Sequence, residues 1–75
     1  MTEKRLLPVS GKQMVKVFIK VGFHIDRQRG SHIVMSKGDA MLVIPDHETV
    51  AKGTERALIK DAGLTVEEFN KLLKR

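Results

Sequence analysis

Three histidines are the residues of this chain best suited to proton transfer near neutral pH, because an unperturbed imidazole has a pKa of about 6.5. They are His24, His32 and His47, separated by eight and fifteen positions. This spacing is not that of local metal ligands, and the chain has no cysteine to supply a thiolate. We therefore expect neither a metal site nor a bound cofactor.

His32 stands in a segment with the groups that acid–base chemistry on a phosphate ester needs. Gly30 and Ser31 precede it as a turn pair. The flanking cations are Arg27, Arg29 and Lys37. Metal-free cleavage of RNA requires a base for the ribose 2′-hydroxyl, an acid for the leaving 5′-oxygen and cations for the charge that grows on the phosphoryl oxygens. Read alone, His32 is either such a catalytic group or an ordinary residue at a strand end.

The other two histidines and one lysine also have two interpretations each. His47 follows Pro45 in a polar loop and is either an accessory proton-transfer group or a surface histidine. His24 alternates with apolar residues, which favours a polar residue on the wet face of a sheet over a catalytic group. Lys52 precedes a predicted helix, where free backbone N–H groups favour a phosphate, or it is simply a lysine beside the helix cap Thr54.

Positive charge is concentrated in one half of the chain. Residues 1–38 hold eight Lys/Arg and two Asp/Glu, whereas residues 39–75 hold six and seven. The net charge of +5 and the pI near 9.9 indicate either a polyanionic partner, with phosphates as the obvious class, or a well-solvated surface.

Length and composition predict one small domain, residues 1–75, with residues 1–8 as an N-terminal tail. Without cysteine, no disulfide framework is expected. The longest apolar run, Ala40 to Ile44, is too short to cross a bilayer, and the first eight residues lack the apolar core of a secretory signal. We expect a cytoplasmic protein without a membrane partner.

Apolar spacing and turn residues predict a helix, three strands, a helix and a short final helix. Ser10 and Gln13 form a capping-box pattern, and Gly22 ends that first helix. The other predicted elements are strands at 23–29, 32–36 and 41–44, a helix from Thr54 to Gly63 and a short helix after the capping box of Thr65. Phe23 and Ile25 are expected on one side of the first strand, whereas alternation assigns no faces to the third. Short loops make the sheet antiparallel, so the fold class is α+β with both helices on one face.

These segments, in this order, resemble the HicA toxins, also called the YcfA-like family. The resemblance covers about Leu7 to Leu73. It rests on Pro8-Val9-Ser10-Gly11, Gly22-Phe23, Arg27-Gln28-Arg29-Gly30-Ser31-His32, Ile44-Pro45-Asp46-His47, and Lys52-Gly53-Thr54 followed by Leu58-Ile59-Lys60-Asp61-Ala62-Gly63-Leu64. One departure follows the histidine motif, where many members have a second histidine or an aromatic residue and this chain has Ile33, Val34 and Met35.

The resemblance implies a fold similar to the double-stranded RNA-binding domain and the activity of an mRNA interferase, a metal-independent endoribonuclease toxin restrained by a HicB-like antitoxin. It implies that His32 is catalytic, that Gly30 and Ser31 shape its turn, and that the Pro45–His47 segment belongs to the motif. Two other functions use the same residues: a non-catalytic module for double-stranded RNA, with Lys52 and Arg56 on phosphates, and a domain that binds an acidic protein.

Overall fold

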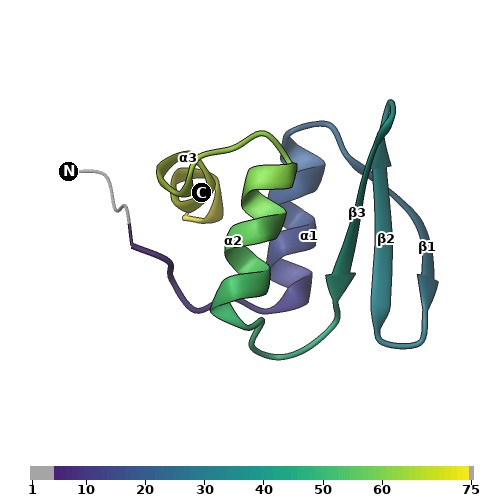
Figure 1. The fold of residues 1–75 in the computed structure, drawn as a ribbon, viewed down its shortest axis with the longest axis horizontal. Helices are drawn as coiled ribbons and strands as arrows, with labels where there is room; N and C mark the ends of the chain where they lie inside the picture. Colours follow the sequence, from purple (N-terminus) through teal and green to yellow (C-terminus); the bar gives the residue numbers. More distant parts are fainter. Residues whose placement is uncertain (1–4, 75) are drawn as a thin grey trace.

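The computed structural model describes residues 5–74. Their order of helix, three strands and two helices confirms the predicted α+β class (Figure 1). The elements are α1 (Gly11–Lys20), β1 (His24–Arg29), β2 (His32–Lys37), β3 (Ala40–Pro45), α2 (Lys52–Asp61) and α3 (Val66–Leu73). None of the helices within residues 5–74 combines the length and hydrophobicity needed to cross a membrane.

The sheet is an antiparallel meander in the order β1-β2-β3. All helices lie on one side of it, with β3 nearest to α1 and α2 and β1 farthest away (Figure 1). The hydrophobic core therefore lies between the helices and the β2–β3 half of the sheet. Phe18 of α1 is its aromatic centre, with ring centroids 6.0 Å from Phe23 and 5.9 Å from Phe69.

The strand register assigns the two faces of the sheet. Ile33, Met35, Leu42 and Ile44 belong to the core, so the alternate residues point away from the helices. We call this second surface the outer face. Its residues are His24, Arg27, Arg29, His32, Val34, Ser36, Met41 and Val43. The third strand, which alternation alone does not orient, thus buries Leu42 and Ile44 and exposes Met41 and Val43.

One detail of the predicted elements is wrong, the start of the second helix. The predicted side of Ile25 is confirmed, because Phe23 belongs to the core and Ile25 pairs directly with the core residue Met35, although Ile25 itself is 51% exposed. β1 is an edge strand remote from the helices, and its pairing is irregular between Ile25 and Arg27. The second helix begins at Lys52 and its N-cap is Ala51, because the N–H of Glu55 already donates to the Ala51 carbonyl at 2.8 Å. Thr54 is therefore a residue of the first turn.

The helix starts at Ser10 and Thr65 are confirmed. Each side-chain oxygen accepts from the backbone N–H three residues ahead at 3.1 Å, and the side chain of that residue accepts in return. Of the predicted tail, residues 1–4 lie outside the described residues. Leu6 is buried, and the Arg5 carbonyl accepts from the Asn70 side chain at 2.9 Å, so the segment just before Pro8 packs on α3.

Candidate functional site

A two-residue turn brings His32 to the start of β2. Gly30 and Ser31 connect the directly paired Arg29 and His32, and Gly30 has φ of 59°, whereas Ser31 does not have a positive φ. Positive φ at the first turn position alone defines a type II′ turn, which glycine adopts without strain and which suits a twisted hairpin. The local sequence therefore accounts for the place of His32 as the first residue of its strand.

Arg29 and Arg27 lie on the same face as His32. Arg29 is the direct cross-strand partner of His32, and Arg27 pairs with Val34 two residues farther along. Directly opposed side chains on one face are about 5 Å apart at Cβ, so a phosphate bound at His32 lies within reach of the Arg29 guanidinium. His32 is exposed, and its imidazole forms no hydrogen bond within residues 5–74.

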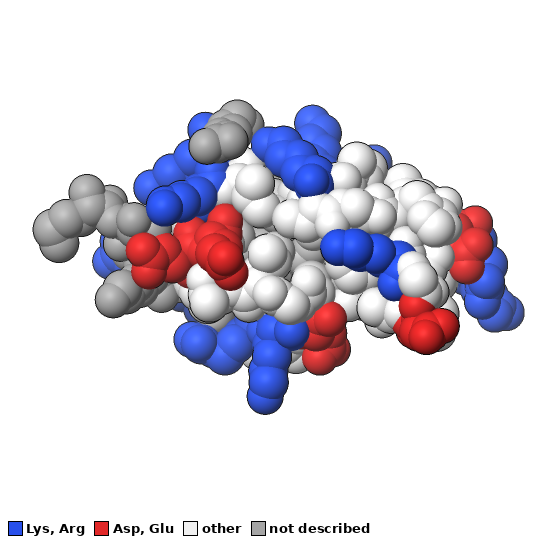
Figure 2. Space-filling view, turned by 90° about the horizontal axis from the view of Figure 1, so that it is seen from above, with Lys and Arg blue, Asp and Glu red and all other residues white. Residues whose placement is uncertain are grey.

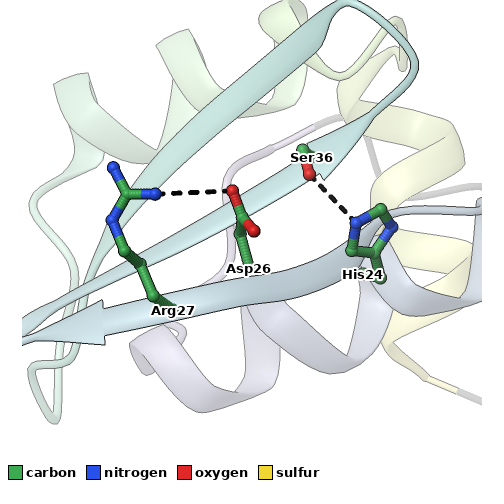
Figure 3. A network of polar contacts seen from close by, with 4 residues as sticks. All are labelled: His24, Asp26, Arg27 and Ser36. Carbon is green, nitrogen blue, oxygen red and sulfur yellow. Dashed lines mark hydrogen bonds and ion pairs between the residues drawn. The ribbon is translucent and has the colours of Figure 1, made fainter.

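Among residues 5–74, Arg27 has one ionic contact, which is weak. Its Nη1 lies 3.5 Å from Oδ2 of Asp26, and both side chains are about half exposed (Figure 3). An exposed pair of neighbours contributes little to stability and is easily exchanged for another anion. Arg27 therefore stays usable as a phosphate ligand beside His32.

Backbone hydrogen bonds attach the loop after β3 to this turn. The N–H of Asp46 donates to the Ser31 carbonyl at 2.7 Å. Gln28 adds a side-chain link, because its Nε2 donates to Oδ2 of Asp46 at 3.2 Å and to the Gly30 carbonyl at 3.1 Å. The turn and the loop are consequently one unit, although His32 and His47 are fifteen positions apart in the sequence.

The start of α1 packs directly against the same loop. The N–H of Gly11 donates to the His47 carbonyl at 2.9 Å, and a Cβ on Gly11 would overlap the Pro45 carbonyl. Glycine is thus required at position 11 by close approach rather than by a turn. A shallow depression forms here, lined by Ser10, Lys12, Asp46, His47 and Glu48.

Lys52 lies at the same end of the molecule, as the first residue of α2 (Figure 1). Its side chain is exposed, and Ala51 offers no side-chain cap to the helix N–H groups. The structure therefore gathers the His32 turn, the His47 loop and the starts of α1 and α2 at one end.

Lys37, which was predicted to flank His32, is not part of this group. His32 and Lys37 are the first and last residues of β2, and the Lys37 Nζ donates to the Val21 carbonyl at 2.7 Å. The same ammonium lies 5.8 Å from the centroid of the Phe23 ring. Five residues of strand separate the two ends by roughly 17 Å, so proximity in sequence did not mean proximity in space.

His24 lies on the outer face at the Lys37 end. Its Nε2 is 3.1 Å from Oγ of Ser36 (Figure 3). Figure 2 views the molecule from the end with the β2–β3 turn, where basic and acidic side chains are interspersed around the outline. Charge at that end is therefore mixed.

The sequence interpretation missed Glu55. Its side chain is fully buried in α2, and neither carboxylate oxygen has a hydrogen-bond partner within residues 5–74. Burial raises the pKa of Glu55 above its ordinary value, while the charges of Lys52 and Arg56 oppose the shift. Its place in a polar stretch of sequence, between Thr54 and Arg56, gave no sign of burial.

Within residues 5–74, no three His, Asp or Glu side chains are grouped so as to hold a metal ion. The features gathered around His32 are arginines on the neighbouring strand, a second histidine in the adjoining loop and the backbone N–H groups at the uncapped start of α2.

Residues 11–64 match the family model described as the HicA toxin of bacterial toxin–antitoxin systems. The chain belongs to the HicA toxin family. A search of curated proteins gave no match. The matched region runs from the glycine that contacts Pro45 to the residue after Gly63, so it includes the His32 turn, the His47 loop and the whole sheet of this HicA protein.

Membership of the HicA family confirms the resemblance seen in the sequence and has one functional consequence. The protein is a toxin of a toxin–antitoxin system, and such a system includes an antitoxin partner.

Proposed function

We propose that this toxin is an endoribonuclease that cleaves mRNA at a site centred on His32. The observation that carries the proposal is the direct pairing of exposed His32 with Arg29 on the outer face. This pairing puts a group that exchanges protons near neutral pH beside a permanent cation that suits a phosphate. Arg27, two residues along the same face, and Lys52 are proposed as further phosphate ligands.

The chemistry needs only side chains and the RNA itself. A base removes the proton of a ribose 2′-hydroxyl, the 2′-oxygen bonds to the adjacent phosphorus, and the bond from phosphorus to the 5′-oxygen breaks as an acid donates a proton to that oxygen. The products are a 2′,3′-cyclic phosphate and a 5′-hydroxyl. Arg29 and Arg27 stabilise the negative charge on the phosphoryl oxygens. No step requires a metal ion.

His32 serves as the acid or the base of this reaction, and His47 is proposed as an accessory proton-transfer group. The Ser31–Asp46 hydrogen bond supports the pairing, since it holds the His47 loop to the His32 turn. If both histidines transfer protons, the cleavage rate has a bell-shaped pH profile, and His47→Ala removes one limb of it. An unchanged pH profile in His47→Ala would mean that His47 transfers no proton, so that His32 acts alone or with another group.

We further propose that the antitoxin is HicB-like and covers the outer face. Exposed apolar side chains lie on this face together with His32: Met41 is 62% exposed and Val43 is 47% exposed. An apolar centre flanked by arginines suits a partner with apolar and acidic groups. His32 would then lose solvent access in the complex, and equal accessibility in the free and bound protein would contradict direct occlusion.

The decisive experiment compares two histidine variants. We expect His32→Ala to lower the rate of RNA cleavage by about 10²- to 10⁴-fold, because it removes a proton-transfer group. His24→Ala is the matched control, since this histidine lies on the same face at the other end of β1. Unimpaired cleavage and growth arrest by His32→Ala would refute the assignment.

The same assay tests the alternative functions. Incubation with single-stranded and duplex RNA separates a nuclease from a module that binds the duplex tightly without cleaving it. Salt-sensitive binding to a co-expressed acidic protein, with no affinity for either RNA, would instead indicate a protein-interaction domain.

A further inference from the structure

The solvent-facing side of α1 carries a row of lysines that the proposed chemistry at His32 does not use. Lys12, Lys16 and Lys20 are all exposed, whereas the other side of the helix is buried in the core. We propose that this row binds the phosphates of a single RNA strand that enters the site. The inference rests on the proposed ribonuclease function and adds the path of the substrate.

The row begins at the candidate site. Lys12 lines the depression shared with His47, and successive lysines rise by about 6 Å along the helix. Lys16 and Lys20 line a groove between α1 and α3, together with Leu72 and Leu73. The row therefore extends roughly 12 Å from the loop of His47 toward the end of α3.

The sequence of α1 does not offset the charge of these lysines. The helix contains no acidic residue, so the lysines repel one another at i, i+4 spacing. Contacts outside α1 involve two of them, since Lys20 donates to the Leu72 carbonyl of α3 and Asp46 and Glu48 line the depression of Lys12. Within residues 5–74, Lys16 has neither kind of contact. Lys12 also stands in the first turn, where the helix dipole disfavours a cation. Phosphates bound along this side of α1 replace the repulsion between lysines by attraction, and a phosphate near Lys12 also interacts favourably with the helix dipole.

Buried aromatic residues indicate how the strand is held. The chain has no Trp or Tyr, and Phe18, Phe23 and Phe69 are all buried. The surface thus has no aromatic ring on which bases could stack, so contacts to phosphates must provide the affinity. This mode predicts binding along α1 that tolerates different sequences and weakens steeply with salt.

RNA suits this row better than a protein does. Protein interfaces have an apolar centre, and the exposed apolar residues Met41 and Val43 lie on the sheet, on the side away from α1. Along α1, the one strongly exposed apolar residue is Ile19. The groove beside Lys16 and Lys20 has apolar walls, but the charged residues that line it are both lysines, and this charge points to a nucleic-acid backbone.

The test measures affinity for a labelled single-stranded RNA of mixed sequence at several salt concentrations. The parent protein carries His32→Ala so that the RNA stays intact. Each lysine that contacts one phosphate contributes about 0.7 to the slope of log affinity against log salt. We expect Lys16→Gln to lower the slope by about 0.7 and affinity at 0.1 M salt by roughly fivefold. For Lys16→Gln/Lys20→Gln we expect the slope to fall by about 1.4 and the affinity at 0.1 M salt to fall roughly 25-fold.

Two controls separate position from charge. Lys60→Gln makes the same change in net charge as Lys16→Gln, at an exposed lysine of α2, and should keep the parent slope. Lys16→Arg/Lys20→Arg retains both cations and should retain the affinity. Because the Lys20 Nζ donates to the Leu72 carbonyl at 2.9 Å, thermal melting of each variant verifies that α3 stays docked, and Lys16→Gln leaves that bond intact.

Each other outcome overturns the inference. RNA binding by the parent with an unchanged slope in the α1 variants would refute the row alone and leave the proposed function standing. Equal losses of affinity in Lys16→Gln and in the Lys60→Gln control would show an effect of net charge only. No RNA binding by the parent would refute the proposed function as well, and impaired binding of an acidic protein with normal RNA binding would assign the row to a protein partner.

Discussion

Each end of the outer face has a histidine, a serine and basic residues next to a glycine turn, yet the two ends use them differently. At one end, His24 contacts Ser36 and Lys37 donates to the Val21 carbonyl. At the other end, backbone and Gln28 hydrogen bonds hold the turn and the loop, and the His32 imidazole forms no hydrogen bond within residues 5–74. At the His24 end, polar side chains make the contacts that hold the structure together. At the His32 end, backbone hydrogen bonds make most of these contacts, so the reactive side chains remain available to a substrate.

The largest expected difference between the ends concerns their cations. Arg29→Gln should lower RNA cleavage about a hundredfold, because it removes a charge placed to stabilise the phosphoryl oxygens. Lys37→Gln should leave the rate within about twofold and lower the free energy of unfolding by about 1 kcal/mol, since it removes a hydrogen bond and a cation–π contact. Initial rates on one RNA and chemical denaturation measure both. Equal losses of cleavage rate in Arg29→Gln and Lys37→Gln would contradict the proposed difference between the two ends.

The partner surface provides the next comparison. Val43→Asp should weaken binding of the cognate antitoxin about thirtyfold, or about 2 kcal/mol, because it inserts a charge at the apolar centre of the outer face. Ile19→Asp makes the same change at an exposed apolar residue of α1 and should bind the antitoxin normally. Calorimetric titration of each variant measures the affinity. A larger loss of affinity in Ile19→Asp than in Val43→Asp would indicate that the antitoxin binds α1 rather than the sheet.

Glu55 makes the starting turn of α2, at the His32 end, sensitive to pH. Because burial raises the pKa of Glu55 in the folded protein, the fold tolerates the protonated carboxyl better than the ionised one. The contribution of Glu55 to the free energy of unfolding is therefore fully present below the ordinary glutamate pKa of 4.5 and is lost as pH rises through the folded pKa. Glu55→Met removes both unpartnered oxygens and should stabilise the protein by about 1–2 kcal/mol at pH 7, and by less at pH 4. Urea unfolding at both pH values tests this prediction. Asp61→Asn, at an exposed acid of the same helix, is the control. A gain in the free energy of unfolding of Glu55→Met that is equal at both pH values would contradict the prediction.

The two glycine turns allow the smallest and most closely matched test. Gly30 and Gly38 have φ of 59° and 56°, and a Cβ added at either position would meet no heavy atom within 4 Å. Gly30→Ala and Gly38→Ala should each lower the free energy of unfolding by about 1 kcal/mol. Cleavage should fall severalfold only in Gly30→Ala, because a small shift of His32 disturbs its alignment with the RNA. Equal activity of the two variants would mean that the Gly30 turn does not position the catalytic group.

Local sequence patterns predicted the elements of this fold well. Ser10 and Thr65 mark helix starts, because a capping box involves residues only three positions apart. Gly22 follows α1 with φ of 106°, and Gly30 forms the expected tight turn. The start of α2 was misplaced, since Thr54 resembles an N-cap in sequence while the helix continues back to Lys52.

Relations between distant residues were less predictable. The exposure of Ile25 depends on the distance of β1 from the helices, and the burial of Glu55 depends on how α2 packs. Gln28 has a polar side chain typical of many strand positions, and nothing in its neighbours indicated a bond to Asp46 eighteen residues away.

By itself, the sequence determined the order of the elements, the place of His32 after a glycine turn, and the membership suggested by its motifs, because each depends on neighbouring residues or on their order. Only the tertiary structure decided which cations accompany His32. Strand register puts Arg29 and Arg27 on its face, and the length of β2 takes Lys37 to the other end. The hydrogen bond from Asp46 holds the His47 loop to the His32 turn, and the one from Gly11 holds the same loop to the start of α1. These contacts form only when the strands pair and the helices pack, so no local pattern encodes them.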